Sequence, residues 1–139
     1  MKITISEARE TDIPGLFEMN KRLMEDERFD RPLDDERLME RWHSFFDKEK
    51  YKVLLFRLEQ DVAGYAVLHI NQEPLYLRHF FIDRQYRRKG LGTECFGRMM
   101  EYMNAGKMDL DVMYWNERGY AFWKSLGFTE RCIMMSLER

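Results

Sequence analysis

The sequence predicts an α/β (α+β) fold, because short apolar runs typical of strands alternate with amphipathic stretches typical of helices along its 139 residues. A glycine-rich basic turn joins one of these strands to the helix that follows it. The composition, 45% hydrophobic with 10 Phe, 7 Tyr and 3 Trp, supports a real core and argues against a disordered chain. We therefore expect a single domain that spans residues 1–139.

The first part of the chain predicts one strand and two helices. Residues 3–8 favour a strand, and a helix opens at residues 11–14, with Pro14 close to its first turn. The apolar stripe of this helix comprises Ile13, Leu16, Phe17, Leu23 and Met24. Residues 25–36 break the stripe and carry seven acidic side chains against two basic ones, a local charge of −5. A second helix then presents Leu38, Trp42, Phe45 and Phe46 on one face.

The remaining elements alternate more regularly. We expect strands at residues 51–58, 62–70 and 75–83, a helix at 93–104 and a short strand at 107–113. The first two of these strands are close enough for a tight hairpin. Asn116, a strong N-cap residue, begins the last helix, and Gly127 fits the position just after its end. Residues 131–137 predict one more strand.

The turn at residues 87–92 has the composition of an anion-binding site. Gly90 and Gly92 let the backbone approach a ligand closely, and the start of the next helix adds N–H groups and the positive end of its dipole. Three cations stand beside them: Arg87, Arg88 and Lys89. We expect this turn to hold a phosphate or pyrophosphate. The alternative is a basic turn that merely opens a helix.

Two common phosphate motifs do not fit this turn. It is not a P-loop, because no Gly-Lys-Ser/Thr follows the glycines. It is not a dinucleotide fingerprint, because Cys95 stands where the third glycine would be. The turn does match the pattern R-x-x-G-x-G.

This pattern, together with a downstream helix that runs from Asn116 to the pair Gly127-Phe128, resembles the GCN5-related N-acetyltransferases (the GNAT superfamily). The resemblance is sharp in residues 75–128 and only topological before them. It implies a mixed central sheet flanked by helices, in the order strand, two helices, three strands, helix, strand, helix, strand. Relatives usually end in two strands, whereas the eleven residues after Phe128 leave room for about one. The rim of the substrate pocket would then be open, or completed by another subunit in a homodimer.

The resemblance implies that acetyl-CoA is a co-substrate. Its pantetheine arm would lie along the fourth strand, in a gap before the fifth, and its pyrophosphate would lie on the basic turn. The cofactor-binding residues expected from the family are Phe80, Phe81, Ile82, Asp83, Arg87, Arg88, Lys89, Gly90, Leu91, Gly92, Thr93, Asn116 and Trp123. Arg88 and Lys89 could instead form a solvated basic corner. Asn116 could be a helix cap alone, or serve both roles.

The expected reaction is direct attack of a neutral amine on the thioester. Relatives often place a Tyr four residues before the glycine of Gly-Phe to donate a proton to the leaving sulfur, but Trp123 stands there, and an indole is no practical acid. Tyr120, one turn earlier, could replace it, or could be an ordinary aromatic on the helix face. Tyr114 is a weaker candidate.

A base must also remove a proton from the amine, which is mostly protonated at pH 7. Glu73 lies just before the fourth strand, where family bases can sit, although a solvated loop residue is the favoured interpretation. His79 lies on that strand and has a suitable intrinsic pKa. Its neighbours Phe80 and Phe81 favour a buried, hydrogen-bonded core histidine instead.

The composition argues against several kinds of binding partner. A net charge of −2 argues against nucleic acid, and no run approaches the ~20 apolar residues that span a membrane. Two cysteines and three scattered histidines predict neither a disulfide framework nor a metal site, and the start lacks a signal-peptide core, so we expect the cytoplasm. The acidic segment 25–36 favours a small cationic amine as acceptor. The rival hypothesis is an acyl-CoA-binding module or sensor without turnover.

Overall fold

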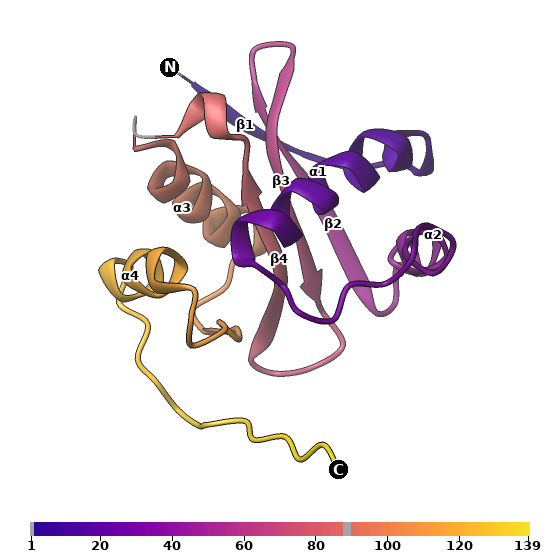
Figure 1. Ribbon diagram of the computed structural model, residues 1–139. Coiled ribbons are helices and arrows are strands. Elements are labelled where there is room, and N and C mark those ends of the chain that lie inside the picture. The colour runs from indigo at the N-terminus through magenta and orange to yellow at the C-terminus, as the bar shows by residue number, and fades with distance from the viewer. Residues whose placement is uncertain (1, 88–89) are drawn as a thin grey trace.

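The computed structural model describes residues 2–87 and 90–139. Arg88 and Lys89, which were expected to contact phosphate, lie outside the described residues. The helices and strands, labelled in Figure 1, are β1 (Ile3–Glu7), α1 (Ile13–Glu27), α2 (Asp35–Ser44), β2 (Tyr51–Leu58), β3 (Asp61–His69), β4 (Leu75–Ile82), α3 (Leu91–Met103), β5 (Met108–Asp109) and α4 (Glu117–Ser125). Two short 3₁₀ turns, Glu10–Asp12 and Arg84–Tyr86, precede α1 and follow β4.

The five strands form one mixed sheet in the order β1-β2-β3-β4-β5. The pairs β1–β2, β2–β3 and β3–β4 are antiparallel, whereas β5 runs parallel to β4. The hairpin between β2 and β3 turns at Glu59, which adopts the left-handed conformation with φ of 59°. The predicted α/β fold is therefore confirmed, as is the tight hairpin.

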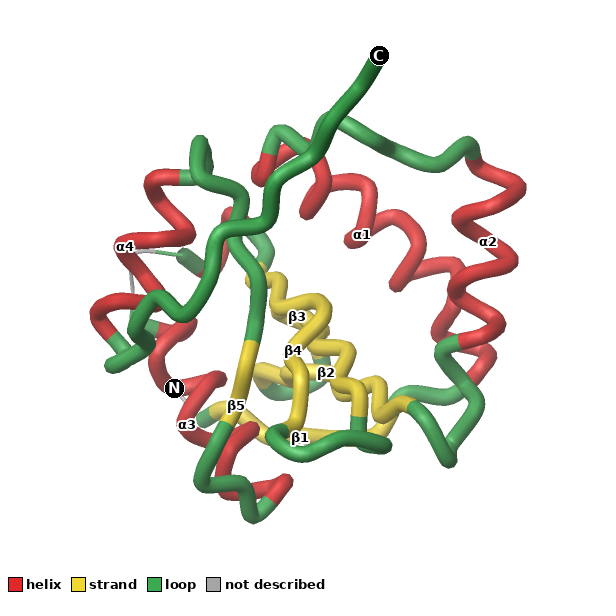
Figure 2. The backbone as a smooth tube through the Cα atoms, turned by 90° about the horizontal axis from the view of Figure 1, so that it is seen from below, coloured by secondary structure: helices red, strands yellow, loops and turns green. Residues whose placement is uncertain are grey.

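The helices cover the two faces of the sheet, with α1 and α2 on one face and α3 on the other (Figures 1 and 2). Side chains that alternate along β3 supply both cores, because successive residues of a strand point to opposite faces. Tyr65 and Val67 pack under α1 and α2, whereas Ala66 and Leu68 pack under α3. The same alternation on β4 sends Phe81 to the α1 side and Ile82 to the α3 side.

The expected strand at residues 131–137 does not form, and that prediction is wrong. The chain after α4 is extended but unpaired, and it runs away from the sheet at the bottom of Figure 1. Its large apolar side chains are at least three-quarters exposed, namely Ile133, Met134, Met135 and Leu137. An apolar sequence with the right period is not enough for a strand, because the backbone groups also need a partner strand.

The fifth strand is also shorter than expected. Only Met108–Asp109 pair with β4, whereas residues 107–113 were predicted to be extended and paired. Among the described residues, no helix is both long enough and apolar enough to cross a membrane.

Candidate active site

A cleft of about 360 Å³ opens between β4, the start of α3, one face of α4 and the end of α1. Ten residues expected to bind the cofactor line it: Phe80, Phe81, Ile82, Arg87, Gly90, Leu91, Gly92, Thr93, Asn116 and Trp123. The structure thus brings the glycine-rich turn and the helix that begins after Asn116 to the same cleft, although they are separate in the sequence. Asp83 is not among the lining residues; its carboxylate accepts from the Arg22 guanidinium at 3.2 Å.

The floor of the cleft is the backbone of β4. This strand pairs with β5 only through Leu75 with Met108 and Tyr76 with Asp109, and the two strands then diverge. Phe80, Phe81 and Ile82 line the cleft beyond that point, while their other edge pairs with β3. Within the described chain, this part of β4 therefore presents a strand edge that a ligand with amide groups can extend, as peptides extend sheets elsewhere.

One end of the cleft is the start of α3. Its N-cap is Gly90, in the left-handed conformation with φ of 74°, and among the described residues no side chain caps the helix. The first N–H groups of the helix therefore lack intrahelical partners, and the residues that carry them, Leu91, Gly92 and Thr93, line the cleft. The helix dipole adds positive character at the same place. These features suit the binding of an anion at this end of the cleft.

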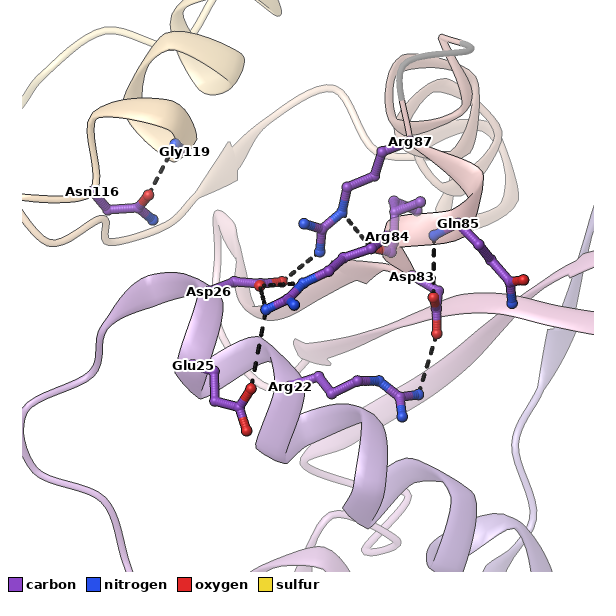
Figure 3. A network of polar contacts seen from close by, with 10 residues as sticks. Arg22, Glu25, Asp26, Asp83, Arg84, Gln85, Arg87, Asn116 and Gly119 are labelled. Atoms are coloured by element: carbon purple, nitrogen blue, oxygen red, sulfur yellow. Dashed lines mark hydrogen bonds and ion pairs between the residues drawn. The ribbon is translucent and has the colours of Figure 1, made fainter.

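Arg87 lies between the anion end of the cleft and α1 (Figure 3). Its Nε donates to the carbonyl of Ile82 at 2.7 Å, and its Nη2 donates to the carboxylate of Asp26. Arg84 donates to the same carboxylate at 2.7 Å. Although burial raises the pKa of Asp26, the hydrogen bonds from Arg87 and Arg84 hold that pKa below its usual value.

On the opposite wall, Asn116 begins α4 as expected. Its Oδ1 accepts from the backbone N–H of Gly119 at 3.0 Å, which confirms the predicted helix cap. A Cβ on Gly119 would lie 2.5 Å from the Nδ2 of Asn116, so the cap depends on the missing side chain. Because only Oδ1 serves the cap and Asn116 lines the cleft, its amide N–H groups can still donate to a ligand.

Trp123 lies in a cluster of aromatic rings. Its ring centroid is 5.4 Å from that of Phe80 and 4.9 Å from that of Phe122, with edge-to-face geometry typical of favourable aromatic pairs. Phe96 and Phe128 complete the cluster. These contacts let Trp123 shape the cleft wall by packing, and they join α4 to β4 and α3.

The proposed acid Tyr120 lies outside the cleft. Its hydroxyl donates to Glu130 Oε2 at 2.8 Å, and Lys124 contacts the other oxygen of that carboxylate at 2.9 Å. The hydrogen bond to Glu130, with burial as a smaller cause, raises the pKa of Tyr120. The weaker candidate Tyr114 is 90% exposed. Neither phenol is placed to donate a proton in the cleft.

The two proposed bases also lie elsewhere. His79 shares a hydrogen bond with the hydroxyl of Tyr65 at 3.0 Å and contacts the rings of Trp42 and Phe45. Burial, followed by the charge of Arg78, lowers the pKa of His79 to about 3, which makes it a weak base. This arrangement matches the alternative of a hydrogen-bonded core histidine. Glu73 is exposed in the loop before β4 and does not line the cleft.

Three titratable cleft residues were missed as site candidates: Asp26, Glu27 and Arg118. Glu27, the last residue of α1, lines the cleft and is half-buried. Burial, and then the charge of Asp26, raise the pKa of Glu27 to about 7. The sequence placed Glu27 in the acidic segment 25–36 but offered no signal that separates it from its neighbours. Within residues 2–87 and 90–139, no group of three or more His, Cys, Asp or Glu side chains could hold a metal ion.

Three solved structures illustrate what this fold is similar to. A possible acetyltransferase from Clostridium difficile 630 is 22% identical, with a TM-score of 0.78 over 100% of this chain and 98% of that one. Aminoglycoside N-acetyltransferase AAC(6')-Iy, in complex with CoA, is 13% identical, with a TM-score of 0.76 over 99% and 95%. The ribosomal-protein-S18-alanine N-acetyltransferase from Escherichia coli is 22% identical, with a TM-score of 0.73 over 94% and 80%.

A search of curated proteins for similar sequences found no match. The family model of the acetyltransferase (GNAT) family, in contrast, matches residues 15–128, which include most of α1, the whole of β4, the glycine turn and α4. The fold and the cleft agree with that match. The chain therefore belongs to the GNAT family and is an N-acetyltransferase of the GNAT type.

Proposed function

We propose that this protein transfers the acetyl group of acetyl-CoA to a primary amine of a small cationic molecule, with both substrates bound at once. The observation that carries the proposal is the cleft in which, within the described part of the chain, an unpaired edge of β4 leads to the start of α3, which no side chain caps. A pantetheine arm has amide groups to pair with that edge, and a pyrophosphate has the charge that the helix start favours. The aminoglycoside acetyltransferase that shares this fold was solved with CoA.

The preference for a cationic acceptor rests on a smaller set of acids than the sequence suggested. Within the acidic segment 25–36, Asp26 is paired with Arg84 and Arg87, and Asp35 is paired with Lys21 at 3.3 Å. Asp34 accepts from a backbone N–H as the N-cap of α2. Of the two carboxylates among the described cleft residues, Glu27 alone lacks a described cation within 4.0 Å, so it is the group that would attract an ammonium.

Release of free CoA thiol with a panel of amines tests the proposal. Spermidine, kanamycin, free amino acids and a peptide with an N-terminal alanine should be compared at equal concentration. We expect spermidine or kanamycin to give the highest kcat/KM, and kcat/KM for either to fall as salt rises, because salt screens the attraction of a cation. A neutral or acidic amine as the best acceptor, without a salt effect, would contradict the cationic class.

The same assay separates the enzyme from a non-catalytic acyl-CoA-binding module. A binding module would raise its melting temperature in acetyl-CoA, as binding to the folded state must, yet release no thiol with any amine. Turnover with any member of the panel excludes this rival. No thermal shift in millimolar acetyl-CoA would contradict both functions.

We also propose that residues 131–137 pack against a second copy of the chain in a homodimer. Four large apolar side chains stand exposed on this unpaired segment, and burying such a patch is favourable. Replacing Ile133 and Met135 together by Asp should shift sedimentation equilibrium from dimer to monomer. Ser136→Asp is the matched control and should leave the mass unchanged. A monomeric wild type would refute this contact.

A further inference from the structure

We propose that the side-chain carboxylate of Glu27 is the general base that takes the proton from the acceptor amine. This assignment rests on the acetyl transfer proposed above and adds to it a catalytic group at the end of α1.

The position of Glu27 places a base where the amine must enter. The cleft is walled by α4 on one side and by the end of α1 on the other, with Phe80 and Phe81 of β4 between them. Among the described lining residues, the titratable side chains are Asp26, Glu27, Arg87 and Arg118. Neither arginine can act as a base, because a guanidinium stays protonated in a protein. The choice therefore falls between the two carboxylates.

Asp26 is unsuited to proton transfer. Its Oδ1 accepts from Arg84 at 2.7 Å, and its Oδ2 accepts from Arg87. A carboxylate held by two guanidinium groups would have to give up those bonds to accept a proton. In the described part of the chain, the carboxylate of Glu27 has no hydrogen bond or ion pair, so its oxygens are available to a ligand in the cleft.

The backbone around Glu27 is held in place from the far side of the cleft. The indole N–H of Trp115 donates to the carbonyl of Glu27 at 3.1 Å, and the guanidinium of Arg28 donates back to the carbonyl of Trp115. These two bonds join the end of α1 to the loop before α4, a separation of 88 residues in the sequence. A base must be positioned within hydrogen-bond reach of its proton, and this tie fixes the backbone that carries the carboxylate.

The environment of Glu27 suits proton exchange near neutral pH. Burial is the larger cause of its raised pKa of about 7, and the adjacent Asp26 is the smaller one. The other ionisable groups around it are Arg28, the C-cap that directly follows it, Tyr65 on β3, Arg87 after β4 and Arg118 on α4. A base works best when its pKa lies near the working pH, because it is then ionised yet still basic.

The two substrates and Glu27 are enough to balance the protons and electrons of the reaction. The ammonium of the acceptor gives one proton to the Glu27 carboxylate, and the freed nitrogen lone pair attacks the thioester carbon. The C–N bond forms, the C–S bond breaks, and its electron pair leaves on sulfur. The nitrogen then loses its second proton to the thiolate or to water. The proton on Glu27 passes to solvent, which restores the carboxylate.

The test is the pH dependence of kcat/KM for wild type and Glu27→Gln, with the best amine of the panel above. We expect kcat of the variant at pH 7.5 to fall by about 100-fold or more, the usual contribution of a general base. The wild-type profile should rise with a midpoint near 7, and the variant should lose that midpoint. Its deficit should shrink toward pH 9.5, where more of an amine with a pKa near 10 is already neutral.

Two controls keep the result specific. Glu18→Gln makes the same change on an exposed position of α1 and should leave the profile unchanged. Calorimetric titration with acetyl-CoA should give a Kd for Glu27→Gln within about twofold of wild type, since the carboxylate acts on the amine. If Glu27→Gln does not fold, Glu27→Asp should keep the midpoint but lower kcat, because the shorter side chain sets the same group farther away.

The outcomes are distinguishable. Normal kcat and an unchanged midpoint in a folded Glu27→Gln would overturn the base assignment and leave acetyl transfer intact. Wild-type protein that acetylates no amine would overturn the proposed function, and the role of Glu27 with it. A loss of activity matched by an equal loss of acetyl-CoA affinity would make Glu27 a binding residue, which also overturns the proposal.

Discussion

Asp26 and Glu27 are adjacent in the sequence, yet they occupy opposite environments at the end of α1. Asp26 points toward Arg84 and Arg87, and its pKa is lowered despite partial burial. Glu27 lines the cleft without a described cation within 4.0 Å, and burial raises its pKa to about 7. Two carboxyl groups with separated pKa values are the usual sign of divided roles. In the proposed mechanism, Asp26 holds Arg84 and Arg87 on the cofactor side, and Glu27 remains for the acceptor amine.

The cofactor side and the acceptor side that we propose for the cleft also differ in the groups that form them. The cofactor side uses backbone groups, namely the free edge of β4 and the first N–H groups of α3. The acceptor side uses side chains brought together from distant parts of the chain, such as Glu27 and Trp115. Backbone sites tolerate changes of side chain but not added bulk, whereas side-chain sites depend on the identity of single residues. The predictions below follow from this contrast.

The largest effect is expected from adding bulk at the backbone side. A Cβ on Gly92 would lie 3.2 Å from the ring of Phe122, and the branched side chain of Gly92→Val would extend into the cleft where phosphate is expected. We expect acetyl-CoA affinity to fall about 100-fold and the thermal shift at a fixed concentration to disappear. Gly97→Val, on an exposed turn of the same helix with open space around the Cβ, is the control. Equal shifts in both variants would refute the anion site at α3.

A smaller effect should follow from removing the charge of Asp26. Asp26→Asn takes a negative charge away from Glu27, so the pKa of Glu27 should fall, though not to its ordinary value because burial is the larger cause. The midpoint of the pH–rate profile should therefore move down, by roughly half a unit to one unit for a neighbouring charge. The pH dependence of kcat/KM measures it. A midpoint that stays fixed or rises would show that the two carboxyl groups are not coupled.

The smallest effect is expected at Tyr120. Its hydroxyl is engaged by Glu130 and lies outside the cleft, so Tyr120→Phe should leave kcat within about twofold of wild type. Steady-state kinetics with acetyl-CoA and the best amine measures the change. A tenfold or larger loss would restore Tyr120 as the acid that protonates the thiolate.

The features that the sequence predicted correctly involve residues close together in the chain. The turn that contains Gly90 and Gly92, and the cap at Asn116, each depend on residues within a few positions of one another, and both were recognised. The pairing of Asp26 with Arg87 joins residues 61 positions apart, and no local pattern encodes it. For that reason the sequence grouped Asp26 with Glu27 as parts of one acidic surface. The strand expected at 131–137 failed for a similar reason, since a strand exists only where the fold supplies a partner.

The central claim, that adjacent carboxyl groups are held in opposite environments, is tested most directly by the pH dependence of unfolding. Because the folded-state pKa of Glu27 is about 7 against an ordinary 4.5, wild type loses stability as pH rises through this range. Glu27→Gln cannot ionise, so it should match wild type at pH 4 and exceed it at pH 8, by on the order of 1–3 kcal/mol. Asp26→Asn should be less stable than wild type at pH 7, and that deficit should shrink as pH falls and Asp26 becomes protonated. Urea unfolding of the three proteins at pH 4, 7 and 8 gives the comparison. A Glu27→Gln protein that is less stable than wild type at pH 8, or an Asp26→Asn protein that is more stable at pH 7, would contradict the account.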